Sequence, residues 1–290
     1  MMIETYDAGL VSQLRRDGFC LVPGVLRPDL LDQLAGLAAR KVAAEDEANL
    51  RRFAHHGSLI PVRYDDAELV ATLTAPEVRA ALRRIGCTDP RWINGYVISK
   101  PPRSPGLWWH QDWWAWGHPR TYVDEPTQLF CMIYLEPTRR ENGCLRAIPG
   151  SHLNRHPLHD LLPEPHTTTI EAQPADSLSH APAHGEIDIL ANPGDLVIGD
   201  VRVMHATHPN TTDRWRTAVD LLLTPDFSTL PREFRAHYVN QFCLPPVGWW
   251  DDPAHPLHGT PLSELLPTYD GPDRDRMMTY SRQPTWPADG

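Results

Sequence analysis

A series of short strand-like runs, separated by turn residues, constrains the fold of this chain more than any other feature. Gly, Pro and Asn interrupt the chain between the runs, as in Glu141-Asn142-Gly143 and Asn192-Pro193-Gly194-Asp195. Several short strands joined by such turns predict a sandwich or a barrel, and a double-stranded β-helix is one such solution. We therefore predict a mainly β fold with a jelly-roll core. The runs cover residues 92–100, 128–135, 144–148, 186–190, 196–198 and 217–223.

Residues 1–90 are predicted to be mainly helical and to pack on this core. Apolar residues between Leu30 and Val42 recur at spacings of three and four, which indicates an amphipathic helix, and Pro28 lies near its start. A second helix is predicted from Thr74 to just before Gly86, because Thr74-Ala75-Pro76-Glu77 has the pattern of a capping box. The segment 18–24 suggests a short strand that ends in a Pro-Gly turn.

The whole chain, residues 1–290, is predicted to form a single domain, because no linker or internal repeat divides it. Residues 91–225 form the expected β core. Within them, residues 151–185 are rich in His and Pro and show little periodicity, so we expect a lid-like insertion over the mouth of the barrel. The proline-rich residues 226–290 are expected to wrap around the domain.

Composition excludes several classes of function. The formal net charge of −10 disfavours a general attraction to nucleic acid or to anionic membranes. No apolar run approaches the roughly 18 residues that a membrane span needs. The five cysteines lack CxxC spacing and are expected to be reduced and mostly buried, and the N-terminus has no signal-peptide character, so we expect a cytoplasmic protein. We expect a small-molecule substrate, and the sequence gives no indication of an oligomeric partner.

The pattern His110-x-Asp112, followed far downstream by His205, suggests a metal centre. Two imidazoles and one carboxylate can hold one face of Fe(II) and leave the other face open for a co-substrate and dioxygen. Residues i and i+2 of a strand point to the same side, so His110 and Asp112 could hold one ion from a single strand. A buried His–Asp hydrogen bond would explain this pair alone, but it would not explain the later histidine or the arginine, Arg216, that follows it.

Other histidines offer alternatives for the third ligand. We favour His205, because it follows a strand-like segment, whereas His208 precedes Pro209 and has the character of a loop residue. Two further groups could suggest a zinc site, but proline interrupts each of them and no cysteine or carboxylate completes the set. We expect these groups to be structural or exposed to solvent; they are His152, His156 and His159, and His180 and His184.

Tryptophans crowd the same region of the sequence. Alternation along a strand would place Trp108, Trp114 and Trp116 on the side of His110 and Asp112. Aromatic side chains near a metal could form an apolar substrate wall, although packing between the sheet and the helices is an equally good explanation for any one of them. The candidate substrate-contacting residues are Trp113, Trp114, Trp116 and Lys100.

Taken together and in order, these segments resemble the phytanoyl-CoA dioxygenase family of Fe(II)/2-oxoglutarate-dependent oxygenases, from Gly18 to about Leu223. The resemblance rests on the order of short motifs, each of which is weak alone. These are Lys100-Pro101-Pro102, His110-Gln111-Asp112, Glu141-Asn142-Gly143-Cys144-Leu145, Pro149-Gly150-Ser151-His152, Pro193-Gly194-Asp195, and His205 with Asn210 and Arg216.

The resemblance implies a cupin-like fold and a set of roles. His110, Asp112 and His205 would bind Fe(II), and Arg216 would bind the far carboxylate of 2-oxoglutarate, although Arg214 could compete for that role from the same face of a strand. Thr207 would help to hold this carboxylate, and Gln128 and Tyr96 would line the cofactor pocket. A tryptophan that relatives carry near the cofactor is replaced here by Met132.

The implied activity uses dioxygen and 2-oxoglutarate and gives succinate and carbon dioxide. Because Asp112 is present, and halogenating relatives lack this carboxylate, we expect hydroxylation of an unactivated C–H bond of a small organic molecule, in bacterial secondary metabolism. Desaturation, cyclisation or epimerisation by the same kind of enzyme stays open. Two other classes are also open: a barrel that binds metal and ligand without turnover, and a zinc hydrolase.

Overall fold

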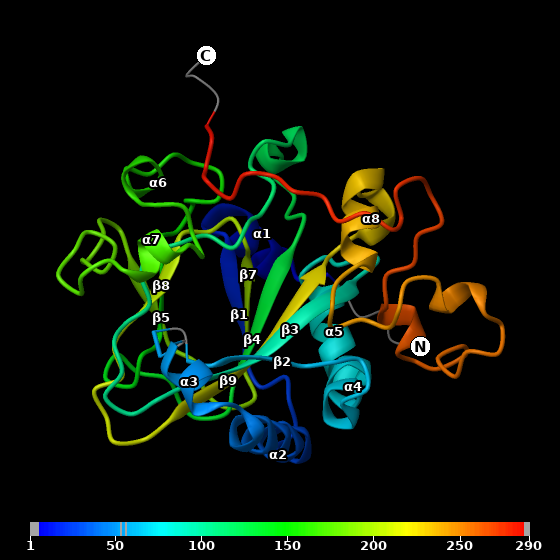
Figure 1. Ribbon diagram of the computed structural model, residues 1–290, viewed down its shortest axis with the longest axis horizontal. Coiled ribbons are helices and arrows are strands. Elements are labelled where there is room, and N and C mark those ends of the chain that lie inside the picture. The colour runs from blue at the N-terminus through cyan, green and yellow to red at the C-terminus, as the bar shows by residue number, and fades with distance from the viewer. Residues whose placement is uncertain (1–5, 53, 56, 287–290) are drawn as a thin grey trace.

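Two antiparallel sheets form the core of the protein (Figure 1). The computed structural model describes residues 6–52, 54–55 and 57–286. The expectation about a signal peptide concerns the N-terminus, and residues 1–5 lie outside the described residues. The larger sheet has six strands in the order β1 (Phe19–Val22), β7 (Leu196–Asp200), β4 (Leu129–Tyr134), β9 (Arg216–Thr224), β3 (Arg91–Lys100) and β2 (Leu59–Pro61). The smaller sheet has the order β6 (Ile187–Ile189), β5 (Leu145–Ala147) and β8 (His205–Thr207).

The predicted strand runs are confirmed, since each overlaps one strand of these sheets, and the jelly-roll core is confirmed with them. The alternation along β4 shows how the large sheet separates two cores. Leu129, Cys131 and Ile133 join the cluster that includes the N-terminal helices. Phe130, Met132 and Tyr134 join the interior cluster that also includes residues of the small sheet. Because strand residues alternate between faces, one strand supplies both the helix-packed face and the interior face that meets the site.

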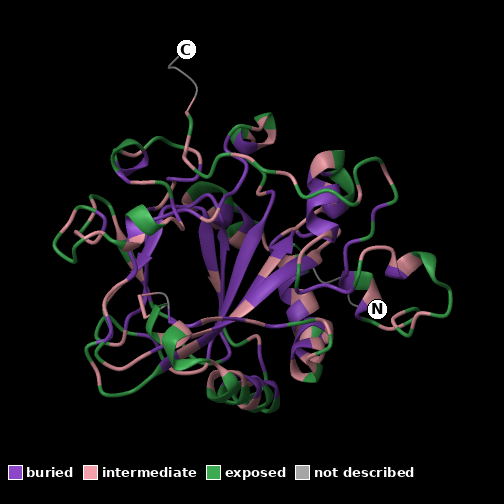
Figure 2. Cartoon of the chain, viewed as in Figure 1, coloured by how far each residue is buried: buried purple, intermediate pink, exposed green. Residues whose placement is uncertain are grey.

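Helices cover the outer face of the large sheet, as predicted for residues 1–90. Burial is concentrated in the strands and on the sheet-facing sides of the helices (Figure 2). The helices of this region are α1 (Ala8–Asp17), α2 (Pro28–Ala44), α3 (Glu47–Arg52), α4 (Ala67–Thr74) and α5 (Pro76–Arg84). Apolar residues of α2 at spacings of three and four, such as Leu30, Leu34 and Leu37, are buried against the sheet.

The predicted capping box at Thr74 is wrong. Thr74 is the last residue of α4, and its hydroxyl donates to the carbonyl of Val70. The helix α5 begins at Pro76 after Ala75, and it has no side-chain cap. A threonine hydroxyl can bond backward to its own helix as well as forward to the next one. The short sequence pattern therefore could not distinguish the end of one helix from the start of another.

The insertion and the C-terminal residues meet each other at one end of the molecule. The insertion contains α6 (Leu158–Leu161) and α7 (Thr168–Glu171), and α8 (Arg232–Val239) begins the C-terminal part. The backbone N–H of Met278 donates to His237 Nδ1 at 3.2 Å, and the Gln283 side chain donates to the carbonyl of His159 at 3.3 Å. The C-terminal segment thus connects α8 with the insertion, as its path in Figure 1 shows.

Short 3-10 turns complete the described chain: η1 (Pro119–Tyr122), η2 (Phe227–Thr229), η3 (Trp249–Asp251) and η4 (Ser263–Leu265). The expected burial of the cysteines is confirmed, because all five are buried. Among the helices of residues 6–52, 54–55 and 57–286, none is long and apolar enough to cross a membrane.

Candidate active site

Two histidines from distant parts of the sequence are paired through their backbones at the edge of the small sheet. The N–H of His110 donates to the carbonyl of His205 at 2.9 Å, and the N–H of His205 donates to the carbonyl of His110 at 2.9 Å. Their imidazole rings lie side by side, with centroids 4.1 Å apart. The third predicted ligand, His205, therefore lies beside His110, and it occupies the first position of β8.

The prediction that His110 and Asp112 share one regular strand is wrong. His110 makes a single isolated bridge, and no strand continues through Asp112. Instead, the backbone N–H groups of Asp112 and Trp113 both donate to the carbonyl of Val201, at 2.9 and 3.1 Å. These bonds turn the chain so that the carboxylate returns to the two imidazoles. The strict alternation expected for the neighbouring tryptophans is lost for the same reason.

The carboxylate of Asp112 faces both imidazoles. Its Oδ1 lies 3.6 Å from His110 Nε2, and its Oδ2 lies 3.5 Å from His205 Nε2. His110 Nδ1 lies 3.0 Å from the carbonyl of Trp108, and His205 Nδ1 lies 3.0 Å from the carbonyl of Val203. A carbonyl only accepts, so each Nδ1 carries the proton, and each Nε2 presents its lone pair toward the carboxylate.

A fourth side chain at this cluster, His166, was not predicted. It comes from the insertion, and its Nε2 lies 3.0 Å from Asp112 Oδ1. Its ring meets the ring of His110 edge-on, with centroids 5.2 Å apart. The backbone of His166 has φ = 57°, a left-handed conformation that residues other than glycine rarely adopt. Its sequence context, Pro165-His166-Thr167, carries no metal-binding spacing, so only the three-dimensional contact identifies it.

The environment of Asp112 keeps its carboxylate ionised. Burial opposes ionisation, but the hydrogen bond that His166 donates favours the charged form, and the pKa of Asp112 lies well below its usual range. An ionised carboxylate only accepts hydrogen bonds, so His166 must be the donor in their contact. The cluster therefore places one anionic carboxylate against two imidazole nitrogens, each within 3.6 Å of one of its oxygens.

These residues line a cavity of about 490 Å³ that also contains the predicted co-substrate residues. Arg216, the first residue of β9, is 1% exposed, and none of its three guanidinium nitrogens has a hydrogen-bond partner among the described residues. The guanidinium lies 5.4 Å from the ring centroid of Tyr134. Arg214, the competing candidate, is exposed and lies before the strand. A buried guanidinium that lacks a partner is suited to bind an anion that enters the cavity.

Thr207, Gln128 and Tyr96 also line the cavity, as expected from the resemblance. The Thr207 hydroxyl accepts from the backbone N–H of Leu107 at 3.0 Å, which leaves its own proton for another acceptor. The side-chain oxygen of Gln128 accepts from the Tyr238 hydroxyl at 3.0 Å. Tyr96 accepts from the amide of Asn94 at 3.1 Å, and burial raises the pKa of its phenol to about 12, so it enters the cavity as a neutral group.

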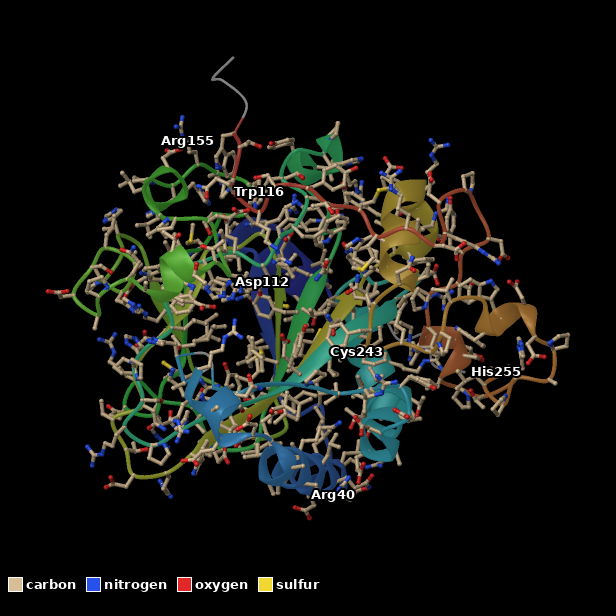
Figure 3. All side chains as sticks on the ribbon, viewed as in Figure 1. Arg40, Asp112, Trp116, Arg155, Cys243 and His255 are labelled. Atoms are coloured by element: carbon tan, nitrogen blue, oxygen red, sulfur yellow. The ribbon has the colours of Figure 1, made fainter. Side chains whose placement is uncertain are left out.

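Of the four candidate substrate residues, Trp114 alone lines the cavity. Trp113 is fully buried and donates to the Thr121 hydroxyl at 2.9 Å, and Trp116 packs against Trp286. Figure 3 shows Trp116 nearer the C-terminal segment than Asp112, which lies near the middle of the molecule. These two predictions are wrong because the turn after His110 directs both rings into the core.

Lys100 does not line the cavity either, and its predicted contact with substrate is wrong. Its side chain is 0% exposed, and Nζ donates to the carbonyl of His55 at 2.6 Å. Burial, and secondarily the charge of Arg216, lower the pKa of its ammonium group well below the usual range. Gly143 packs against it with φ = 84°, and a Cβ there would lie 2.9 Å from both Lys100 Cδ and the carbonyl oxygen of His208.

Residues 226–290 were expected only to wrap around the domain, but several of their side chains line the cavity. The Trp114 ring stacks on His237 of α8 with centroids 3.8 Å apart, and burial lowers the pKa of His237 to about 4. A proline-rich tail gives no sequence signal for such contacts, because they depend on where the chain turns back. The cavity-lining residues of this part are His237, Tyr238, Gln241, Met277, Met278, Thr279, Tyr280 and Arg282.

The alternative ligand, His208, lies outside this cluster. Its Nε2 is 2.7 Å from Asp188 Oδ1, and Arg140 donates to the other carboxylate oxygen of Asp188 at 2.8 Å. By the distances between their ligand atoms, all within 4.8 Å of one another, His110, Asp112 and His166 form one potential metal-binding group, and Cys144, Asp188 and His208 form another. The arginine already neutralises the carboxylate there, so hydrogen bonds and ion pairs account for the group. The expected structural role of His152 is supported by its bond to the carbonyl of Arg15 at 3.1 Å.

Residues 14–218 match the family model of phytanoyl-CoA dioxygenase (PhyH), which is most of the chain and includes every residue of the cluster. This chain belongs to the phytanoyl-CoA dioxygenase family. This chain is 24% identical over 275 residues to the ectoine dioxygenase of Sphingopyxis alaskensis. The match covers 87% of this chain and 86% of that one. The chain is also 27% identical over 158 residues to a probable alpha-ketoglutarate-dependent hypophosphite dioxygenase of Stutzerimonas stutzeri. That second match covers 52% of this chain and only 50% of the relative.

Solved structures of similar fold support the jelly-roll architecture. This chain resembles HygX from Streptomyces hygroscopicus, whose structure holds nickel and 2-oxoglutarate. The TM-score is 0.57 and the identity 17%, and the match covers 76% of this chain and 88% of that one. The chain also resembles SnoN, a non-heme alpha ketoglutarate dependent epimerase of nogalamycin biosynthesis, with a TM-score of 0.55 and 21% identity over 74% of this chain and 81% of that one. At these identities the likeness shows the fold.

Proposed function

We propose that this protein is an Fe(II)- and 2-oxoglutarate-dependent oxygenase that oxidises a C–H bond of a small organic molecule. His110, Asp112 and His205 would hold the metal, and Arg216 would bind the far carboxylate of 2-oxoglutarate. The observation that carries the proposal is that two Nε2 atoms lie within 3.6 Å of the oxygens of one carboxylate, in a cavity that also holds a buried arginine without a hydrogen-bond partner among the described residues.

The donor set fits a ferrous ion. Two neutral imidazoles and one carboxylate form the facial set that non-haem iron oxygenases use, which leaves three positions for other ligands. Both imidazoles are held in the ligating tautomer by backbone carbonyls, as outer partners of metal-binding histidines commonly do. When bound, Fe(II) together with 2-oxoglutarate and dioxygen supplies the oxidising power and gives succinate and carbon dioxide as by-products.

The side chains of the cavity would bind and orient 2-oxoglutarate and the substrate, and they would exclude water. The planar guanidinium of Arg216 can donate two parallel hydrogen bonds to a carboxylate, and the Thr207 hydroxyl lines the same cavity and has a proton to donate. Trp114, Phe130 and Met132 give the wall apolar character, which limits water near the reacting atoms. Met132 stands where relatives carry tryptophan. Its side chain is smaller and more flexible than an indole, so this part of the wall can adapt its shape to a ligand.

We propose further that residues 1–290 act as one oxygenase domain, in which the insertion 151–185 serves as the lid through His166. The presence of Asp112 favours hydroxylation over halogenation as the reaction. Desaturation, cyclisation and epimerisation stay open, because the same fold serves an epimerase and a carbocyclase of nogalamycin biosynthesis. An acyl-CoA substrate is disfavoured, since the described residues that line the cavity include two arginines, Arg216 and Arg282, and no further Lys or Arg for its phosphates.

Turnover in the presence and absence of oxygen tests the proposal. Purified protein is incubated with Fe(II), 2-oxoglutarate and a metabolite extract, and succinate is measured beside new masses shifted by about +16 or −2 Da, the changes expected for oxygen insertion or loss of two hydrogens. We expect succinate only when both oxygen and Fe(II) are present. Oxygen-independent activity with Zn(II) would instead show a hydrolase, and ligand binding without succinate would show a sensor or carrier.

A further inference from the structure

Asp220 is a buried acid in the cavity that the proposed chemistry does not use. It lies on β9, is 8% exposed and lines the cavity, and its Oδ1 has no hydrogen-bond partner among the described residues. In the sheet register it stands directly between Tyr96 of β3 and Met132 of β4, which also line the cavity. It is four residues after Arg216 on the same strand face, about 13 Å away at the usual strand rise.

If Fe(II) and 2-oxoglutarate bind as proposed, the charges in the cavity leave Asp220 without a counter-ion. Fe(II) brings two positive charges and 2-oxoglutarate two negative charges, while Asp112 and Arg216 add one of each sign, so these four cancel. Arg282 lines the cavity but is exposed to solvent. His237 is neutral near pH 7, because burial lowers its pKa to about 4. When Asp220 is ionised, its negative charge therefore stays uncompensated inside the loaded cavity.

Burial of such a charge is costly unless a ligand supplies its partner. In the absence of a ligand, burial and the nearby Asp112 raise the pKa of Asp220 to about 7, which shows the strength of this penalty. The surrounding wall is suited to a cation as well. Aromatic rings of Trp114, Tyr238 and Tyr280 line the same cavity, and Trp114 and Tyr238 meet edge-on at 5.9 Å. Ring faces stabilise ammonium groups.

We propose that Asp220 is a substrate-binding residue that pairs with a protonated amine, so the substrate is a small molecule with a basic nitrogen. The amine binds Asp220 on the floor formed by β3, β9 and β4, and the aromatic wall covers the rest of the molecule. This inference rests on the proposed function, because the charge balance assumes that metal and 2-oxoglutarate are bound.

Matched probes of equal size test the inference without knowledge of the true substrate. Benzylamine, benzyl alcohol and benzoate are titrated into anaerobic protein loaded with Fe(II) and 2-oxoglutarate, and binding is followed through the visible absorption of the complex. The variant Asp220→Asn keeps the shape and removes the charge, and Asp213→Asn serves as control because Asp213 pairs with Arg103 on the surface. Charge-assisted hydrogen bonds are worth enough to predict a preference of about ten-fold or more for the amine.

Each outcome decides the matter. We expect wild type and Asp213→Asn to bind benzylamine about ten-fold or more tightly than benzyl alcohol, and Asp220→Asn to lose this preference with unchanged affinity for 2-oxoglutarate. Equal or undetectable binding of the three probes to the loaded wild type overturns the inference and leaves the proposed function intact, as does a preference that survives in Asp220→Asn. If the wild type binds neither Fe(II) nor 2-oxoglutarate, the proposed function fails and the inference fails with it.

Discussion

His110 and His205 donate their backbone N–H groups to each other's carbonyls, both at 2.9 Å. This reciprocal pair joins segments 95 positions apart at the edge of the small sheet, and it sets the imidazole centroids 4.1 Å apart. Each ring is then oriented by a carbonyl at its Nδ1. The two nitrogen donors are thus placed by the backbone itself, before any metal is considered, which is the preorganisation that a precise site requires.

Removal of one of these imidazoles should abolish metal binding. Outer partners of metal ligands typically contribute about 10- to 100-fold to affinity, so loss of a ligand itself should exceed 100-fold. We expect His205→Ala to lose Ni(II) or Co(II) binding by more than that factor in calorimetric titrations. His208→Ala is the matched control, because this nearby histidine pairs with Asp188 instead. If His208→Ala loses the metal and His205→Ala keeps it, the ligand assignment is wrong.

His166 should act as a positioning residue for Asp112. Its hydrogen bond occupies Oδ1 at 3.0 Å, which favours binding of a metal through Oδ2 alone. We expect His166→Ala to weaken Co(II) binding by about 10-fold and to change the visible Co(II) spectrum, because the freed carboxylate can bind through both oxygens. His166→Gln, which retains an N–H donor, should recover part of the loss. His184→Ala, in the same insertion, should match the wild type; a Co(II) spectrum unchanged in His166→Ala would refute this role.

Arg216 should determine the affinity for 2-oxoglutarate. Loss of one partner of a buried, hydrogen-bonded charge pair costs about 2–5 kcal/mol, which corresponds to about 30-fold or more in the dissociation constant. We expect this loss in Arg216→Ala, and little recovery in Arg216→Lys, because an ammonium lacks the two parallel donors. The exposed Arg214→Ala serves as control. Unchanged 2-oxoglutarate affinity in Arg216→Ala would remove the proposed co-substrate site.

The fold could be predicted largely from the sequence because its information is local. Strand runs, turns and the amphipathic pattern of α2 each depend on residues close in the chain, and the structure confirms the six strand runs and the α2 helix. His205 was favoured because it follows a strand-like segment, and Arg216 was assigned through the family resemblance. The structure places both in one cavity with His110. The exception is Thr74, where one local pattern fits two different hydrogen bonds.

The parts that were missed depend on where the chain turns back in space. The two hydrogen bonds to the carbonyl of Val201 break the expected strand after His110, so Trp113 and Trp116 enter the core. No spacing rule connects His166 to Asp112, which are separated by 54 positions and meet only because the insertion folds over the site. The same reason applies to His237, whose stacking on Trp114 joins the C-terminal part to the cavity wall.

The raised pKa of Asp220 predicts a specific pH dependence of stability in the metal-free protein. Its folded pKa of about 7 lies above the ordinary value of 3.8, so between about pH 4 and 7 the folded state holds a proton that the unfolded chain has released. Stability should therefore fall as pH rises through this window, by at most about 1.4 kcal/mol per pH unit from this group. Asp220→Asn should remove this contribution. Urea unfolding at several pH values compares the two proteins, and parallel curves would contradict the prediction.

Anaerobic titration of 2-oxoglutarate into the Fe(II)-loaded protein tests the central claim most directly, because it requires the metal and the co-substrate to meet in this cavity. We predict a weak visible charge-transfer band that saturates in the wild type, is absent in His205→Ala, and needs much more 2-oxoglutarate in Arg216→Ala. Folded wild-type protein that gives no band under these conditions, or a band that persists in His205→Ala, would contradict the account.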